Sequence, residues 1–399
     1  MDRSRFRKRA VGLWGAGCLG SAGLMVAGVI SGATSVIALG AVAGVLVLSV
    51  GDRYLRRHDA IPVLVWHSVS ENADWLPWAD NISVRPEVFA AQIDALLRWG
   101  FSIVSDRALA ASMQGQLELP DHAVVLNFDD GYRDNLRAAL PVLQARGAPA
   151  TIFIASDFIE PETRSDMEWK GYLSAQELRQ IDANPLFEIA SHGRDHGRLP
   201  VSGRSVETFS PTNWKMHAAV IWGRVPGNKS KWYEAETPVP FAFGDPVPQT
   251  DSALTARHWV NGKAEDAAGF AGRVTGHLGD ARSTLEEALG RSVDFLCWPF
   301  DRVTDEARAS ARAAGFQLMT GGRGYNAPGE SIEQISRMHI TDFVFGGGPV
   351  WCEVLGFRAK VMMASGNLYW MPVVWVASWL RRRKFRAGLN PVANPAAHR

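Results

Sequence analysis

The chain has 399 residues, of which 47% are hydrophobic and 21% are charged, and its formal net charge at pH 7 is +1. A near-neutral chain of this composition is not a nucleic-acid binder as a whole, and its length is ample for one domain with appendages. The three cysteines are too few for a disulfide framework, and they do not have the spacing of a zinc site.

The N-terminal segment, residues 1–58, is predicted to be a membrane anchor. Basic residues flank an uncharged stretch over 11–50. A single span needs about 20 apolar residues, so a run of this length predicts a two-helix hairpin over 11–30 and 35–50. A long signal peptide is the alternative, although its apolar region is usually shorter. Basic flanks at both ends place the following domain on the cytoplasmic face of the inner membrane, whereas a single span would place it outside.

Residues 59–345 are predicted to form one α/β domain. Short apolar runs that are typical of strands alternate with segments whose apolar residues recur at helical spacing. The predicted strands cover 61–66, 101–104, 123–128, 150–155, 187–191, 294–298, 316–320 and 335–340. This alternation favours a parallel sheet covered on both faces, and seven or eight such units can close into a barrel.

Two adjacent acids, Asp129 and Asp130, follow the predicted strand over 123–128 and precede Gly131. In parallel α/β folds, reacting groups lie at the carboxyl ends of strands, so both carboxylates are predicted to face the mouth of the barrel. A cation would relieve the repulsion between the two charges. An ordinary Asp-Gly turn is the alternative interpretation.

A second polar group follows the predicted strand over 187–191. His192 and His196 are four residues apart, so on a helical turn they share one face. Two imidazoles and one carboxylate are a familiar ligand set for zinc or a similar divalent ion. A lone histidine is more often structural, but here two occur at ligand spacing.

Two regions depart from the strand–helix alternation. The stretch over about 200–271 is rich in Pro, Gly and Trp without a clean period, which predicts an irregular insertion beside the site, such as a lid or a substrate wall. Residues 361–380 carry no charge and include one Tyr and three Trp, residues that prefer the headgroup level, and a basic cluster follows over 381–384. Residues 346–399 are therefore predicted to be an amphipathic segment at a membrane interface. A helix that packs on the domain is the alternative.

Three motifs occur in a specific order. NFDDGY (127–132), SHGRDH (191–196) and CWPFD (297–301) resemble the successive motifs of the NodB-homology polysaccharide deacetylases, carbohydrate esterase family four. LVWHSVS (64–70) resembles the opening of the branch that includes the poly-N-acetylglucosamine deacetylases. The resemblance spans about residues 61–345. It implies a distorted (β/α) barrel of seven or eight units that removes acetyl groups from N-acetylated sugars.

The resemblance also implies roles for individual residues. Asp129 would be the general base, and the metal ligands would be Asp130, His192 and His196. The metal is expected to be zinc, with cobalt or nickel as alternatives. His339 is the first candidate for the general acid, and His67 is another. The residues expected to bind substrate are His67, Tyr132, Trp298 and Asp301, with the backbone N–H of Tyr132 as a donor to the oxyanion.

Several positions depart from the family pattern. Asn127 stands where a Thr is common, and Asp301 stands where a Gly is common. The arginine that supports the base in the family has no clear equivalent, because Cys297 occupies its place and Arg302 lies nearby in the sequence. These changes bear on the pKa of the base and on the shape of the groove, and they leave the metal set intact.

The sequence thus predicts a membrane-associated, metal-dependent hydrolase that removes the N-acetyl group from an N-acetylhexosamine unit of a polysaccharide or a lipid-linked sugar. The expected partners are that glycan or lipid-linked amino sugar and membrane lipids, without nucleic acid. Two alternatives stay open: a deformylase or deacetylase of another small sugar amide, and a non-catalytic carbohydrate-binding member of a polysaccharide biosynthesis complex. An intact Asp129 argues against the second, since a binder has no use for a base.

Overall fold

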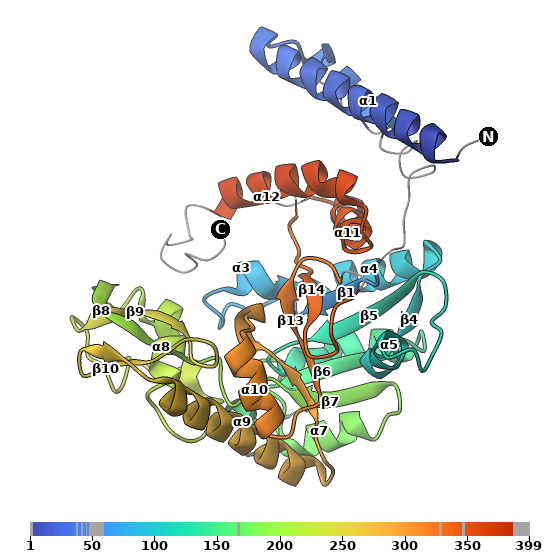
Figure 1. The fold of residues 1–399 in the computed structure, drawn as a ribbon. Helices are drawn as coiled ribbons and strands as arrows, with labels where there is room; N and C mark the ends of the chain where they lie inside the picture. The colour runs from blue at the N-terminus through green and yellow to red at the C-terminus, as the bar shows by residue number, and fades with distance from the viewer. Residues whose placement is uncertain are drawn as a thin grey trace.

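The computed structural model describes residues 3–36, 39–40, 43–44, 46–47, 60–165, 168–326, 329–344 and 348–385. Its central sheet consists of β1 (Val63–Trp66), β4 (Ser102–Val104), β5 (Ala123–Phe128), β6 (Ala150–Ile154), β7 (Phe187–Ser191), β12 (Phe295–Cys297), β13 (Leu318–Arg323) and β14 (Ile335–His339). The strand order is β1-β14-β13-β12-β7-β6-β5-β4, and β1 also pairs with β5. Seven parallel strands therefore close into a barrel, and β4 adds to it beside β5 (Figure 1).

The predicted parallel barrel is thus confirmed, and each of the eight predicted strands is present. Successive side chains of a strand point to opposite faces, and both faces are buried here. Val63, Val125 and Phe295 belong to a cluster that fills the barrel, while Leu64, Leu126 and Leu296 belong to the cluster between barrel and helices. This double burial explains why the strands read as nearly continuous apolar runs.

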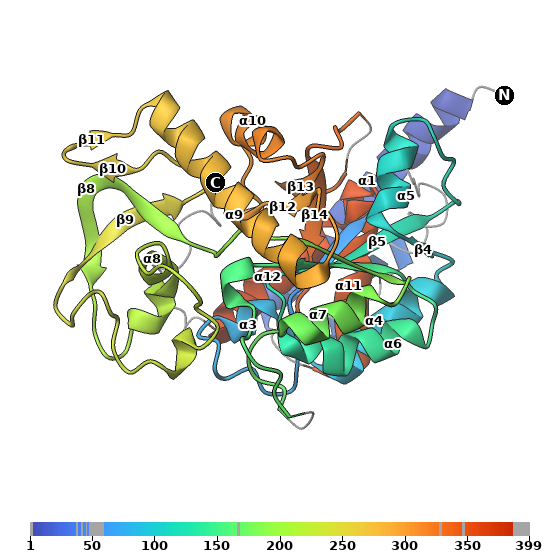
Figure 2. The ribbon, with the colours of Figure 1, turned by 90° about the horizontal axis from the view of Figure 1, so that it is seen from below.

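Helices cover the outside of the barrel, as Figure 2 shows. They are α4 (Pro86–Arg98), α5 (Asp106–Met113), α6 (Leu140–Gln144), α7 (Ala175–Asp182), α9 (Ala267–Leu289) and α10 (Asp305–Ala313). Leu109 and Ala110 of α5 join the cluster inside the barrel, so α5 closes the amino-terminal end of the strands. Helix α7 begins at a capping box in which Ser174 and Glu177 each bond the other's backbone N–H.

The stretch over 200–271, predicted to be irregular, contains regular elements. A long antiparallel ribbon joins β8 (Arg198–Thr208) to β9 (Pro246–Ser252), and β10 (Trp259–Val260) pairs with β11 (Lys263–Ala264). Helix α8 (Ala218–Trp222) lies between the ribbon strands in the sequence. The prediction missed the ribbon because its register shifts twice and it is only partly buried, so its side chains follow no clean alternation.

Two short pieces complete the mouth of the barrel. Strand β2 (Ser68–Val69) pairs with β3 (Ser83–Val84), and α3 (Ala79–Ile82) lies between them in the sequence. Single helical turns occupy Ser156–Phe158, Trp214–His217, Trp232–Glu234, Pro299–Asp301 and Leu368–Trp370, and a π-helical turn, Asn135–Ala139, precedes α6.

The N-terminal helix α1 (Arg3–Ser31) starts within the basic residues and not at residue 11. Among the residues that the structure describes, no helix combines the length and apolarity that crossing a bilayer requires. The predicted pair of transmembrane helices is therefore not supported. Half of the predicted second span, 35–50, and the segment from there up to residue 59 lie outside the described residues.

The C-terminal region forms two helices, α11 (Val350–Ala364) and α12 (Met371–Phe385), which pack on each other (Figure 1). Helix α11 also packs on α4, and its Phe357, Val361 and Met362 are fully buried. For α11 the structure thus shows the alternative that was left open, a helix that packs on the domain. The basic tail beyond Phe385 lies outside the described residues.

Candidate metal and catalytic site

The polar side chains singled out in the sequence gather at the carboxyl ends of four strands. Asp129 follows β5, His192 follows β7, Cys297 ends β12, and His339 ends β14. All four side chains point into the barrel, because each is an even number of residues away from the inward-facing apolar residues of its strand. They form a polar layer at the mouth, above the apolar side chains that fill the barrel.

A sharp turn separates the two adjacent acids. Asp130 and Gly131 both have positive φ, 72° and 73°. A Cβ at Gly131 would lie 2.8 Å from Cδ1 of Ile154, so a side chain there would be strained by the backbone and would clash. This turn lets Asp129 point into the barrel, where it is 2% exposed, while Asp130 stays at the rim.

Asp130, His192 and His196 converge as predicted. Oδ1 of Asp130 lies 3.1 Å from Nε2 of His196 and 3.5 Å from Nε2 of His192, and the two ring nitrogens are 2.7 Å apart. Oδ1 is buried and has no well-oriented hydrogen bond to any described residue. Nδ1 of His192 is 3.0 Å from the carbonyl oxygen of Cys297, a contact that fixes the ring and turns Nε2 toward the other two atoms. Three electron-pair donors that face one another fit a divalent cation.

The base candidate has a partner that the sequence analysis missed. Arg337 on β14 donates from Nη1 to Oδ1 and from Nη2 to Oδ2 of Asp129, at 2.8 Å each. Burial alone would raise the pKa of Asp129, but the charges of Arg337 and His192 outweigh it and hold the pKa well below its usual range. Arg302, the nearby residue considered from the sequence, instead pairs with Asp251.

Arg337 could have been found from the strand period. Arg337 lies two residues before His339 in the sequence RMH (337–339). Alternate residues of a strand share a face, so if His339 points into the barrel, Arg337 should point into it as well.

Asp301, predicted to bind substrate, is buried and bonded to two side chains of β14. It is 7% exposed, its Oδ1 accepts from Nη2 of Arg337 at 2.6 Å, and its Oδ2 contacts Nε2 of His339. Burial raises the pKa of Asp301, but His339 and Arg337 together hold it well below its usual range. The carboxylate at the position of the family glycine thus supports both Arg337 and the candidate acid His339, whose side chain remains 36% exposed.

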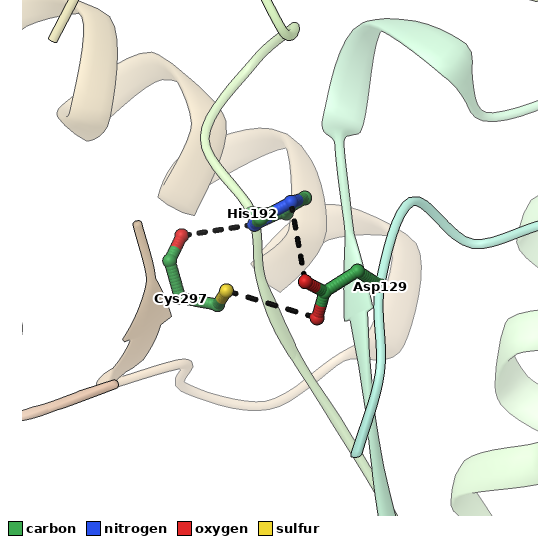
Figure 3. Close-up of side chains that lie close together, drawn as sticks. All are labelled: Asp129, His192 and Cys297. Atoms are coloured by element: carbon green, nitrogen blue, oxygen red, sulfur yellow. Dashed lines mark hydrogen bonds and ion pairs between the residues drawn. The ribbon is translucent and has the colours of Figure 1, made fainter. Parts of the chain in front are cut away.

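A second donor set overlaps the first and is drawn in Figure 3: Asp129, His192 and Cys297. Sγ of Cys297 lies 3.7 Å from Oδ1 of Asp129. Burial holds the pKa of this thiol well above its ordinary value, so it stays protonated, and both oxygens of Asp129 are already bonded to Arg337. Asp130, His192 and His196 are therefore the better of the two donor sets for a cation.

His67 lies beside Asp129, the candidate base. Its Nε2 is 3.9 Å from Oδ2 of Asp129, and its ring centroid is 5.2 Å from that of His339. Asn135, three residues after the first motif, fixes the backbone here by donating to the carbonyl of His67 at 2.7 Å. Asp134 accepts from the hydroxyl of Ser68 at 2.6 Å.

The side chain of Trp298 and the ring of Tyr132 are both buried, whereas the role predicted for Tyr132 belongs to its backbone N–H. Trp298 is fully buried in the cluster between barrel and helices, because it follows the inward-facing Cys297 and so takes the opposite face. The ring of Tyr132 is 2% exposed and packs against Tyr172 and Trp75, with centroids 5.4 Å and 5.6 Å away.

Asn127, which stands where a Thr is common in the family, belongs to a buried hydrogen-bond network beneath the site. Asn127 donates to Oδ2 of Asp106 at 2.7 Å, and the hydroxyl of Thr151 donates to the same oxygen at 2.7 Å. Burial raises the pKa of Asp106 to about 7 against the opposing hydrogen bond from Thr151. This network lies one inward position below Asp129 on β5, between the polar layer and the apolar filling.

The insertion is tied to the loop that carries the histidines. Arg194 and Lys229 both contact Asp157, at 3.3 Å and 2.5 Å, and Lys229 also lies 3.0 Å from Asp195. Lys229 is 6% exposed. A buried cation from the insertion therefore holds the loop between His192 and His196, which agrees with the prediction that the insertion lies beside the site.

Comparisons with known proteins agree with this geometry. Residues 116–220 match the family model described as polysaccharide deacetylase. Over 144 residues the chain is 28% identical to the poly-β-1,6-N-acetyl-D-glucosamine N-deacetylase of Escherichia coli K12, an alignment that covers 34% of this chain and only 21% of that protein. A de-N-acetylase from Aggregatibacter actinomycetemcomitans shares the fold, with a TM-score of 0.53, 18% identity, and coverage of 75% of this chain and 100% of the other. The BpsB deacetylase domain from Bordetella bronchiseptica gives a TM-score of 0.50 at 18% identity, covering 71% and 97%.

Proposed function

We propose that this chain, which contains a polysaccharide deacetylase domain of the NodB type, hydrolyses the N-acetyl amide of an N-acetylhexosamine unit. Members of this family are carbohydrate N-deacetylases and therefore hydrolases. The observation that carries the proposal is the position of Asp129, an ionised carboxylate clamped by Arg337 directly beside the three donors of Asp130, His192 and His196. The carrier of the sugar is a polysaccharide or a lipid.

Asp129 is suited to act as the general base. Arg337 fixes both of its oxygens and keeps it ionised, so it can accept a proton from an attacking water without first losing one. A bound divalent cation would polarise the amide carbonyl and lower the pKa of the attacking water. We propose zinc for this role, with cobalt or nickel as alternatives, because two imidazoles and one carboxylate form its common catalytic ligand set.

His339 is suited to protonate the leaving amine. Its Nε2 is held by Asp301, and its partly exposed ring faces the mouth beside His67. The contact with Asp301 fixes the orientation of the imidazole. Base and acid thus approach the substrate from different strands, Asp129 from β5 and His339 from β14.

The test combines metal content with release of free amine. The full-length protein is compared with Asp129→Asn and His192→Ala, using N-acetylhexosamine oligomers and a lipid-phosphate-linked N-acetylhexosamine as substrates. We expect about one divalent ion per chain in the wild type and in Asp129→Asn, but not in His192→Ala. We expect amine release from the wild type only. A wild type without metal would overturn the proposal, and turnover by Asp129→Asn would overturn the role of the base.

A further inference from the structure

Helix α12 presents large apolar side chains to solvent. Trp375, Val376 and Trp379 are 61%, 55% and 51% exposed, and their spacing places them on one side of the helix. Ala377, on the opposite side of α12, is buried, and so is Trp370 in the turn before the helix. Two tryptophans exposed side by side are unusual on the surface of a monomeric domain and mark a site of interaction.

Neighbouring segments extend this surface. The exposed apolar side chains of α11 and of the turn before α12 are Trp351, Leu355 and Leu368. The ring of Tyr369 in the same turn contacts Trp14 of α1, with centroids 5.0 Å apart, and α1 runs above α12 in Figure 1. We refer to Trp351, Leu355, Leu368, Trp375, Val376 and Trp379 as the α12 surface.

Acidic and basic residues are distributed unevenly along the chain. Residues 52–353 contain 29 Lys and Arg against 40 Asp and Glu, a net charge of −11. Residues 1–51 and 354–399 contain 13 Lys and Arg and a single acid, a net charge of +12. No Asp or Glu follows Glu353, and Arg381, Arg382, Arg383 and Lys384 come directly after the exposed tryptophans. The near-zero total therefore hides two basic terminal segments, and the C-terminal one includes α12.

We propose that the α12 surface binds to a lipid bilayer that contains anionic lipids, with α12 lying in the plane of the headgroups. Tryptophans prefer that depth, and the basic run beside them would be attracted to anionic headgroups. A second copy of the chain is the competing occupant, but pairing two such surfaces would bring two basic regions together. Charge complementarity therefore favours the bilayer.

The two helices that carry most of the α12 surface, α11 and α12, are hydrogen-bonded to residues near the mouth of the barrel. Arg381 donates to the carbonyl of Asp342 at 3.3 Å and to Oδ1 of Asn81 at 3.1 Å. Lys360 of α11 donates to the carbonyl of His339 at 2.9 Å. Docking would thus hold the β14 side of the mouth near the headgroups, within reach of an N-acetylated sugar carried by a lipid. This last consequence rests on the proposed function, whereas the docking itself does not.

Vesicle flotation of the full-length protein tests the docking. The vesicles contain phosphatidylcholine alone or with roughly a third phosphatidylglycerol, at low and at high salt. The test variant is Trp375→Ser/Trp379→Ser, and the matched control is Trp169→Ser/Val206→Ser, which removes exposed apolar side chains elsewhere. We expect the wild type and the control to float with anionic vesicles, and the test variant to partition at least about tenfold more weakly.

The outcomes separate the alternatives. Equal flotation of the test variant and the wild type would overturn the proposal, because α1 is intact in both and would then account for binding. A wild type that floats with neither vesicle would also overturn it. Sedimentation that shows a dimer lost in the test variant, without vesicle binding, would assign the surface to a second copy. Amine release from a soluble oligomer, measured in parallel, reports on the proposed function and is expected to be unchanged.

Discussion

Arg337 and Asp129 are 208 residues apart in the sequence and form a two-point ion pair inside the barrel, with both contacts at 2.8 Å. The guanidinium supplies two parallel donors, whereas a lysine would supply a compact charge without the fork. The pair therefore fixes the direction of the base as well as its charge.

We expect Arg337→Lys to lower the rate of deacetylation by about 10²-fold, because general-base catalysis depends on the position of the carboxylate. Metal content should stay at the wild-type level, since Arg337 contacts none of the three proposed ligands. Arg302→Lys is the control, because Arg302 pairs with Asp251 and not with the base. A comparable loss in Arg302→Lys, or loss of metal in Arg337→Lys, would contradict the assigned role.

A double-mutant cycle tests the link between Asp301 and His339. We expect Asp301→Asn and His339→Gln each to slow amine release, and the double variant to be little slower than His339→Gln alone, because the two residues act as one unit. Asp301→Asn also removes a partner of Arg337, and this contribution is the only loss that the double variant should show beyond that of His339→Gln. Independent effects that multiply in the double variant would show that Asp301 does not act through His339.

Asp106 should make stability depend on pH. Its pKa in the folded chain is about 7, against 3.8 for an ordinary aspartate, so the folded state binds more protons between these values. The free energy of unfolding should therefore fall as pH rises from about 3.8 to about 7, by up to about 1.4 kcal/mol per pH unit. Asp106→Asn should remove this slope and unfold at higher denaturant than the wild type at pH 8. An unchanged slope in urea titrations would refute the prediction.

Gly131→Ala should destabilise the fold for two separable reasons. The positive φ costs an L-residue about 1–2 kcal/mol, and the new Cβ would lie 2.8 Å from Cδ1 of Ile154, which adds about 1–3 kcal/mol. Ile154→Val removes that Cδ1, so the double variant should lose less than the two single losses combined. Gly147→Ala is the control for φ alone, because a Cβ there has no neighbour within 4 Å. Equal losses at the two glycines would show that the overlap is not significant.

The parts of the fold that the sequence predicted share one physical cause. The eight strands were found because each is a short apolar run buried on both faces. The proposed metal ligands Asp130, His192 and His196 were singled out because they follow two of those runs. Helix α9 begins at Ala267, within the stretch over about 200–271 that was predicted to be irregular. Its four glycines before residue 280 weaken the helical signal.

The errors at the site also have a common cause. Trp298 was expected to contact substrate because it lies within the third motif, but motif membership does not specify which face of the strand a residue takes. Cys297 faces inward, so Trp298 must face the helices. Arg337 was missed for the complementary reason: it lies outside every motif, and only closure of β14 onto β1 brings it to Asp129. The local strand period gives the inward direction of Arg337, but its pairing with Asp129 follows from topology.

Strand β14 carries both Arg337, which holds the base, and His339, which is suited to be the acid. Its pairing with β1 aligns His339 with Val65. A slip of one residue would exchange both inward side chains at once for their neighbours and leave Met338 facing Asp129. Changes in the length of the loop before β14 are therefore tolerable only when they leave the register of the strand unchanged. A single insertion within β14 can displace Arg337 and His339 together.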